Sequence, residues 1–180
     1  MDVGRTSVLS GRTATSLEGA HEGGTARHTL VVFGLDDRDF ALPIEDIAEV
    51  VPMVLITPVP EVPPWVEGVI NLRGRVIPIV DLRRRLAMEP LPHALNTPIL
   101  IAEQGTRKLG LIVDEIRDVV SLGDEDLEPP AEVALDPTGN AEAVSAVGRL
   151  GERLIVVLDL MRVTGDAAPL AEDRRAADVG

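Results

Sequence analysis

One β-hairpin pattern occurs twice in this chain, and no other feature constrains its fold as strongly. Residues 68–82 read GVINLRGRVIPIVDL, two apolar segments that reverse at Arg73-Gly74-Arg75, where a glycine provides the backbone freedom for a tight turn. Residues 147–160 read VGRLGERLIVVLDL. With an offset of 78, six of fourteen aligned positions are identical: Val69/Val147, Leu72/Leu150, Arg75/Arg153, Ile77/Ile155, Asp81/Asp159 and Leu82/Leu160. The repeat predicts an architecture built twice from one unit.

A second match precedes the hairpin in both copies, this time with an offset of 69. The identical pairs are Arg38/Arg107, Leu42/Leu111, Ile47/Ile116, Val50/Val119 and Val51/Val120. The change of offset places nine extra residues in the second copy, within 121–142. Apolar strands also resemble one another by chance, but two matches in the same order favour duplication. Two copies of about five short strands predict two small β-barrels.

Composition narrows the class of protein. The formal net charge of −13 argues against binding to nucleic acid or to an anionic membrane surface. The chain has no cysteine, which excludes disulfides and thiolate metal sites, and the aromatic set of two Phe and one Trp leaves the core to Val, Leu and Ile. The first twenty residues lack the apolar segment of a signal peptide, and no apolar run reaches the length of a membrane span. We therefore expect a cytoplasmic protein.

The pattern along the chain predicts ordered strands between two tails. Residues 1–27 are rich in Gly, Ser, Thr and Ala without periodicity and are predicted to be disordered, and residues 165–180 to be flexible. Residues 43–47 could form one helical turn, since Pro43 occupies its first position. The Pro-rich stretch 56–65 is too constrained for a helix. Residues 81–86 read as a short helix that Asp81 could cap, as Asp159 could in the second copy.

Residues for catalysis are scarce, and we predict no enzymatic activity, cofactor or metal. His21, His28 and His93 lie far apart and none has the spacing partner of a metal site. No serine lies in a nucleophile elbow and no glycine-rich loop would hold a phosphate. The acidic clusters at 36–39 and 124–126 lack calcium-loop spacing and are interpreted as solvated turns.

Three side chains suit binding to a partner, although each also has a structural interpretation. Arg73 at the hairpin tip could project its guanidinium toward carboxylate or backbone oxygens of a partner, or could be a solvated turn charge. Glu49 alternates with apolar neighbours, as on a binding face or an ordinary outward face. Trp65 follows two prolines and could pack or form an exposed hot spot, of which packing is favoured. Arg75, matched by Arg153, is interpreted as structural.

At GVINLRGRVIPIVDL the chain resembles the bacterial chemotaxis coupling protein family CheW. The resemblance extends through FGLDDRDFALPIEDIAEVV, ITPVPEVPPWVEGV, LGLIVDEIRDVVSL and GRLGERLIVVLDL, roughly residues 29–163. It implies a mainly β fold of two interlocked five-stranded SH3-like barrels with short helices. The implied domain is 28–164, with subdomains of roughly 44–97 and 98–146 that exchange strands from 29–43 and 147–164.

The resemblance also implies a function without catalysis: an adaptor that joins chemoreceptor cytoplasmic tips to the regulatory domain of the histidine kinase CheA, in the cytoplasm at membrane receptor arrays. The implied receptor-binding groove contains Ile47, Glu49, Gly68, Asn71 and Arg73. Segment 131–147 matches the family poorly.

Two other functions stay open at this point. One is the same fold serving a non-flagellar or non-motility chemosensory pathway. The other, from a different class, is a small-ligand-binding or enzymatic β-barrel, which would need a concave pocket with converging polar groups.

Overall fold

The computed structural model describes residues 25–130 and 140–165, and their fold is mainly β, as predicted. The predicted tails and part of the predicted insertion therefore lie largely outside the described residues. The elements are β1 (Arg27–Leu35), β2 (Arg38–Pro43), η1 (Ile44–Asp46), β3 (Ile47–Pro52), β4 (Val66–Leu72), β5 (Arg75–Asp81), α1 (Leu82–Arg85), β6 (Pro98–Gln104), β7 (Arg107–Ile112), β8 (Glu115–Gly123), η2 (Asp124–Asp126), β9 (Leu127–Glu128), η3 (Asn140–Ala143), β10 (Val144–Leu150), β11 (Arg153–Leu158) and α2 (Leu160–Thr164).

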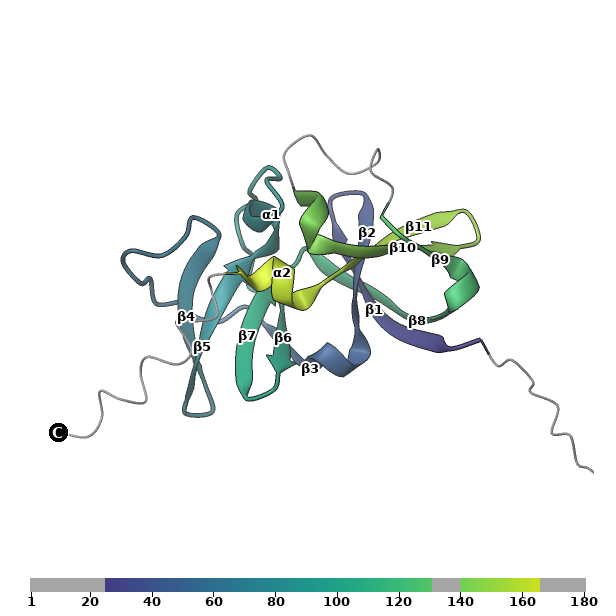
Figure 1. Ribbon diagram of the computed structural model, residues 1–180. Helices are drawn as coiled ribbons and strands as arrows, with labels where there is room; N and C mark the ends of the chain where they lie inside the picture. Colours follow the sequence, from purple (N-terminus) through teal and green to yellow (C-terminus); the bar gives the residue numbers. More distant parts are fainter. Residues whose placement is uncertain (1–24, 131–139, 166–180) are drawn as a thin grey trace, which may run out of the picture.

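The strands form two sheets that lie side by side (Figure 1). Sheet A has the order β8-β1-β2-β11-β10-β9, and sheet B the order β3-β6-β7-β5-β4. Sheet B has the five strands expected, whereas sheet A has a sixth, the two-residue β9. This strand lies in the stretch where the second copy carries its extra residues, so the repeat did not predict it.

The two sheets exchange strands in the same way. Each combines the first hairpin of one half with the third strand and last hairpin of the other half. In sheet A, β1 pairs with β8 antiparallel and β2 with β11 parallel. In sheet B, β6 pairs with β3 antiparallel and β7 with β5 parallel. The predicted duplication is therefore present in the pairing as well as in the order of elements, and each half completes the sheet of the other.

Strand alternation divides the buried side chains into three cores. In β1, Leu30 and Val32 join the core of sheet A, while Val31, Phe33 and Leu35 point into a core shared by both sheets. In β6, Ile99 and Ile101 join a core of six isoleucines in sheet B, while Leu100 and Ala102 enter the shared core. Because successive side chains point to opposite faces, a strand buried on both faces reads as a continuous apolar run.

Both short helices begin as the sequence predicted. The side chain of Asp81 accepts hydrogen bonds from the backbone N–H groups of Arg83 and Arg84, and that of Asp159 accepts one from Arg162. Each carboxylate thereby satisfies amide groups that the helix leaves without partners. The predicted turn at 43–47 is the 3₁₀ helix η1, and the Pro-rich stretch 56–65 contains no helix.

Trp65 is a packing residue. It is partly buried against the shared core, and the guanidinium carbon of Arg85 lies 5.1 Å from its ring centroid, within the range of a cation–π contact. Among the described residues, no helix is both long and apolar enough to cross a membrane.

Candidate surface for partner binding

The hairpin tip at Arg73 is joined to the distant strand β3 by an ion pair. Nη1 of Arg73 donates to Oε1 of Glu49 at 2.6 Å and Nη2 donates to Oε2 at 2.9 Å. Strand β3 is at one edge of sheet B, and β4 and β5 are at the other end of the strand order. The pair therefore connects strands that are not neighbours and bridges one end of the curled sheet.

The electrostatics of this pair follow from its hydrogen bonds. The guanidinium of Arg73 lowers the pKa of Glu49, and Glu49 in turn raises the pKa of Arg73. The Arg73 side chain is still 73% exposed. An arginine has five N–H donors and Glu49 takes two of them, so three remain for a partner. The fixed, outward-facing fork can bind a carboxylate or backbone oxygens.

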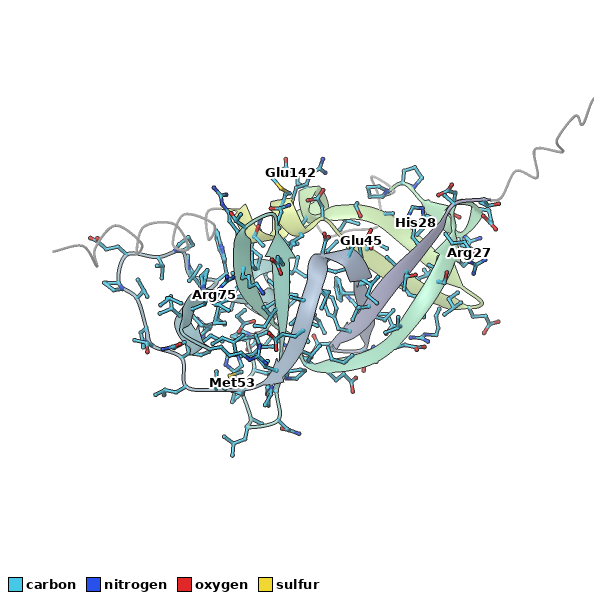
Figure 2. All side chains as sticks on the ribbon, turned by 90° about the horizontal axis from the view of Figure 1, so that it is seen from below. Arg27, His28, Glu45, Met53, Arg75 and Glu142 are labelled. Carbon is cyan, nitrogen blue, oxygen red and sulfur yellow. The ribbon has the colours of Figure 1, made fainter. Side chains whose placement is uncertain are left out.

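A surface hollow of about 370 Å³ lies beside the ion pair. We call it the hairpin hollow, and it is lined by Glu49, Leu72, Arg73, Arg75, Ile77, Glu103 and Lys108. Three cationic and two anionic side chains surround two apolar ones. In a chain with a net charge of −13, this is a locally basic site, which suits an acidic partner with some apolar surface. Figure 2 shows Arg75 well away from Arg27 and His28, which lie at the far end of sheet A.

The turn that presents Arg73 is held by two other predicted residues. Arg73 and Gly74 have φ angles of 50° and 82°, the left-handed pair of a type I′ turn. The Gly74 amide donates to Oδ1 of Asn71 at 2.9 Å. Sequence reasoning assigned the positive φ to glycine alone, and the structure extends it to Arg73, a residue in which this conformation is uncommon. Asn71 thus stabilises the turn.

Gly68 and Ile47 contact other parts of the same chain, which gives both a structural role. Thr57 bridges to Val69 through two backbone hydrogen bonds of 2.8 and 2.9 Å, and a Cβ on Gly68 would lie 2.2 Å from the Thr57 carbonyl oxygen. Glycine therefore lets this segment pass close to β4. Ile47 is partly buried against the shared core, and a bulge separates it from Glu49. The large apolar side chain that β3 exposes is Val50, next to Glu49.

Of the five predicted residues, the structure thus brings Glu49 and Arg73 into direct contact. The sequence analysis did not identify Leu72, Ile77, Glu103 or Lys108 as neighbours of this pair. Glu103 and Lys108 form their own ion pair of 3.2 Å across the β6–β7 hairpin. The sequence held one signal for this ion pair. Residues on either side of a tight turn lie opposite each other on the two strands of a hairpin.

Comparison with known proteins now adds the family. The model of the CheW-like domain matches residues 29–168. The chain belongs to the CheW-like domain family. A chemotaxis protein CheW from Rhizobium meliloti is 34% identical over 149 residues, which cover 82% of this chain and 91% of the relative. A chemotaxis protein CheW from Klebsiella aerogenes is 30% identical over 141 residues, covering 78% and 84%.

A solved structure agrees with this assignment. The scaffolding protein TtCheW from Thermoanaerobacter tengcongensis superposes with a TM-score of 0.71 at 33% identity, covering 78% of this chain and 94% of that one. A relative with another name, PilI from Pseudomonas aeruginosa, is 38% identical over 109 residues, which cover 58% of this chain and 61% of the relative. The predicted CheW resemblance and fold class are confirmed, and with them the class of scaffold protein.

Proposed function

We propose that this chain is a non-catalytic adaptor that couples chemoreceptor cytoplasmic tips to the regulatory domain of the histidine kinase CheA. Membership of the CheW-like domain family supports the class of protein. The observation that carries the receptor half of the proposal is the Arg73 fork, held by Glu49 and 73% exposed at the rim of the hairpin hollow. The preorganised fork loses little conformational freedom when a partner binds.

In this proposal the receptor tip lies in the hairpin hollow. Leu72 and Ile77 give an apolar floor, and Arg73, Arg75 and Lys108 attract acidic side chains of the receptor. Gly68 and Asn71 act indirectly, by shaping the hairpin. Ile47 packs against the shared core and so helps to hold β3 in place. Adaptors of this kind work through binding energy and geometry, and transient signalling contacts often bury a modest area, so we expect a dissociation constant around 1 μM, or about −8 kcal/mol.

The test is a pull-down and calorimetric titration of the full chain with a receptor cytoplasmic tip and a CheA regulatory domain. Arg73→Ala and Glu49→Ala should each weaken receptor binding at least about tenfold, a loss of about 1.4 kcal/mol. The matched control is Arg149→Ala, which removes another exposed ion pair, with Glu128 at 2.8 Å on the β9–β10 side of sheet A. Arg149→Ala should bind receptor as the wild type does. Equal receptor binding by Arg73→Ala and the wild type would contradict the proposal.

A second candidate function is the same coupling role in a non-flagellar or non-motility chemosensory pathway. The similarity to PilI, a relative not named CheW, favours keeping it. Co-precipitation from the native cell separates the two, because each pathway has its own receptors and kinase.

The small-ligand or enzymatic barrel has weaker support. Ser145 and His93 line different hollows, and neither hollow brings a serine and a histidine together. A metabolite that raises the melting temperature of the full chain, in the absence of receptor and kinase binding, would favour this alternative.

A further inference from the structure

Three side chains with metal-binding atoms meet beside helix α1. Glu67 comes from β4, Asp81 from the end of β5, and His93 from the segment that connects α1 to β6. One ligand atom of each lies within 4.8 Å of the others. Spacing along the sequence gave His93 no partner, because the fold brings it to the carboxylates from three separate segments. We propose that Glu67, Asp81 and His93 form a Zn²⁺-binding site.

The distance between His93 and Asp81 suits a small tetrahedral ion, and the ligand atom of Glu67 lies within 4.8 Å of the other two. Nε2 of His93 lies 3.2 Å from Oδ2 of Asp81. Zn²⁺ binds imidazole nitrogen and carboxylate oxygen at about 2.0–2.2 Å, so two ligands of a tetrahedral site lie about 3.3 Å apart. The two atoms already have this separation. Their pairing as a hydrogen bond in the free protein holds the ring where the ion would need it.

Asp81 is fixed before any ion arrives. Its side chain is 2% exposed, and Oδ1 accepts the Arg83 and Arg84 amides as the cap of α1. Oδ2 is left to face His93. A ligand whose orientation is set by a second hydrogen bond loses less freedom on binding a metal. The capping role and the ligand role use different oxygens of one carboxylate.

Glu67 has a cationic neighbour, which an incoming Zn²⁺ would displace. Its Oε1 is buried and accepts no hydrogen bond among the described residues. The nearest cation is Nε of Arg84, at 3.1 Å from this oxygen and 3.8 Å from Oδ2 of Asp81, as an ion pair without hydrogen-bond geometry. The Glu67 side chain is 22% exposed, and this ion pair compensates its charge. The Arg84 side chain is 47% exposed, so it can rotate into solvent when Zn²⁺ takes over its charge.

Two of the three ligands, Asp81 and His93, line a hollow that gives access to the site. This hollow has a volume of about 170 Å³, and Arg83 and Thr97 also line it. Three protein ligands and a free fourth position for solvent complete a tetrahedral set. Bound Zn²⁺ would fasten the connection between the two halves, where His93 lies, to sheet B. The adaptor would then hold this connection more firmly in the presence of the ion.

The test is titration of the untagged full chain with ZnCl₂, followed by calorimetry and thermal unfolding. We expect one ion per chain and a melting temperature that rises with Zn²⁺ concentration, because a ligand that binds only the folded state stabilises it. His93→Ala and Glu67→Gln should each weaken binding about tenfold or more. Arg84→Ala, which removes the competing cation, should strengthen it.

The matched control is His28→Ala. His28 also contacts a carboxylate, Asp124 at 2.7 Å, but no third ligand group joins that pair among the described residues. Its loss should leave Zn²⁺ affinity unchanged. The proposal is overturned if the wild-type chain binds no Zn²⁺, or if His93→Ala and Glu67→Gln both fold, as judged by circular dichroism, and bind Zn²⁺ with wild-type affinity.

Discussion

Arg83 of α1 binds Asp114, 31 residues later in the chain, through two hydrogen bonds: Nε to Oδ1 at 2.7 Å and Nη2 to Oδ2 at 2.6 Å. The same guanidinium contacts Asp36 in the β1–β2 turn and donates to the Glu89 carbonyl at 2.8 Å. Its side chain is 5% exposed. One buried cation therefore joins α1, which follows β5 of sheet B, to the β1–β2 turn and to the residue before β8, both of which border strands of sheet A.

We predict that Arg83→Ala destabilises the protein by about 2–3 kcal/mol, because removal of one partner from a buried ion pair leaves the other charges without compensation. The value lies below the range of about 3–5 kcal/mol for fully buried pairs, since Asp36 and Asp114 both keep contact with water. Urea unfolding followed by circular dichroism measures the change. Arg83→Lys should recover part of the loss by retaining the charge without the planar fork. A midpoint within error of the wild type for Arg83→Ala would contradict this role.

Acid should weaken the fold through Asp39 and Asp114. Burial alone would raise the pKa of each, but hydrogen bonds outweigh it and lower both pKa values: from Arg117 and Arg153 to Asp39, and from Arg83 to Asp114. A carboxyl group with a lowered folded-state pKa binds fewer protons in the native state. Its stabilisation is complete above the ordinary value of 3.8 and is lost as the pH falls through the folded-state pKa.

The measurement is urea unfolding at a series of pH values from 7 to about 2, which covers the window below the ordinary pKa. The free energy of unfolding should fall at the acid end, and the slope should be smaller in Asp39→Asn and Asp114→Asn. The pKa shift of Asp46 has the opposite direction, because burial and the negative charges of Glu45 and Asp159 raise its pKa. Asp46→Asn should therefore stabilise the protein at pH 7. An unchanged acid slope in both Asp39→Asn and Asp114→Asn would refute the assignment.

Gly68 and Gly74 should respond very differently to alanine. Gly68→Ala adds a Cβ that would lie 2.2 Å from the Thr57 oxygen at a φ of 143°, so we expect a loss of about 2 kcal/mol or more. Gly74→Ala meets open space at a φ of 82° and should cost only the backbone strain, about 1 kcal/mol. Thermal unfolding of the two variants checks the order. Equal losses would show that the close approach of Thr57 contributes nothing.

Arg85 connects the two short helices, and its removal should loosen α2. Its Nε donates to the Val163 carbonyl and its Nη2 to the Arg162 carbonyl, both at 2.7 Å. Hydrogen bonds from a charged donor contribute about 1.5–3 kcal/mol when partly buried, so Arg85→Ala should speed hydrogen exchange of the α2 amides. Arg84→Ala, which changes the next side chain and leaves these bonds intact, is the control. Exchange rates that stay at wild-type values in Arg85→Ala would contradict this docking role.

The local elements of this fold could be predicted from sequence, because their signals are local. The β4–β5 and β10–β11 hairpins, the capping by Asp81 and Asp159, and the packing of Trp65 follow from turn residues, alternation and composition. The strand exchange does not follow from pattern. Since the two halves are alike, a strand would find similar apolar partners in either copy, and only the resemblance to the family implied the exchange.

The candidate site divides in the same way. Glu49 and Arg73 were each identified from their local setting, but their contact was not, because β3 and the β4–β5 hairpin are not neighbours in sheet B. His93 was set aside for lack of a partner at a recognisable spacing. A contact that depends on how three separate segments converge leaves no periodic trace in the sequence, and it becomes visible only in the folded chain.

The pairing of β3 with β6 and of β8 with β1 has a consequence for any attempt to divide the chain. A single half, expressed alone, would expose the edges that its sibling now covers, and exposed edges associate. An isolated half would tend to pair with a second copy of itself or to aggregate, so the two halves fold as one unit.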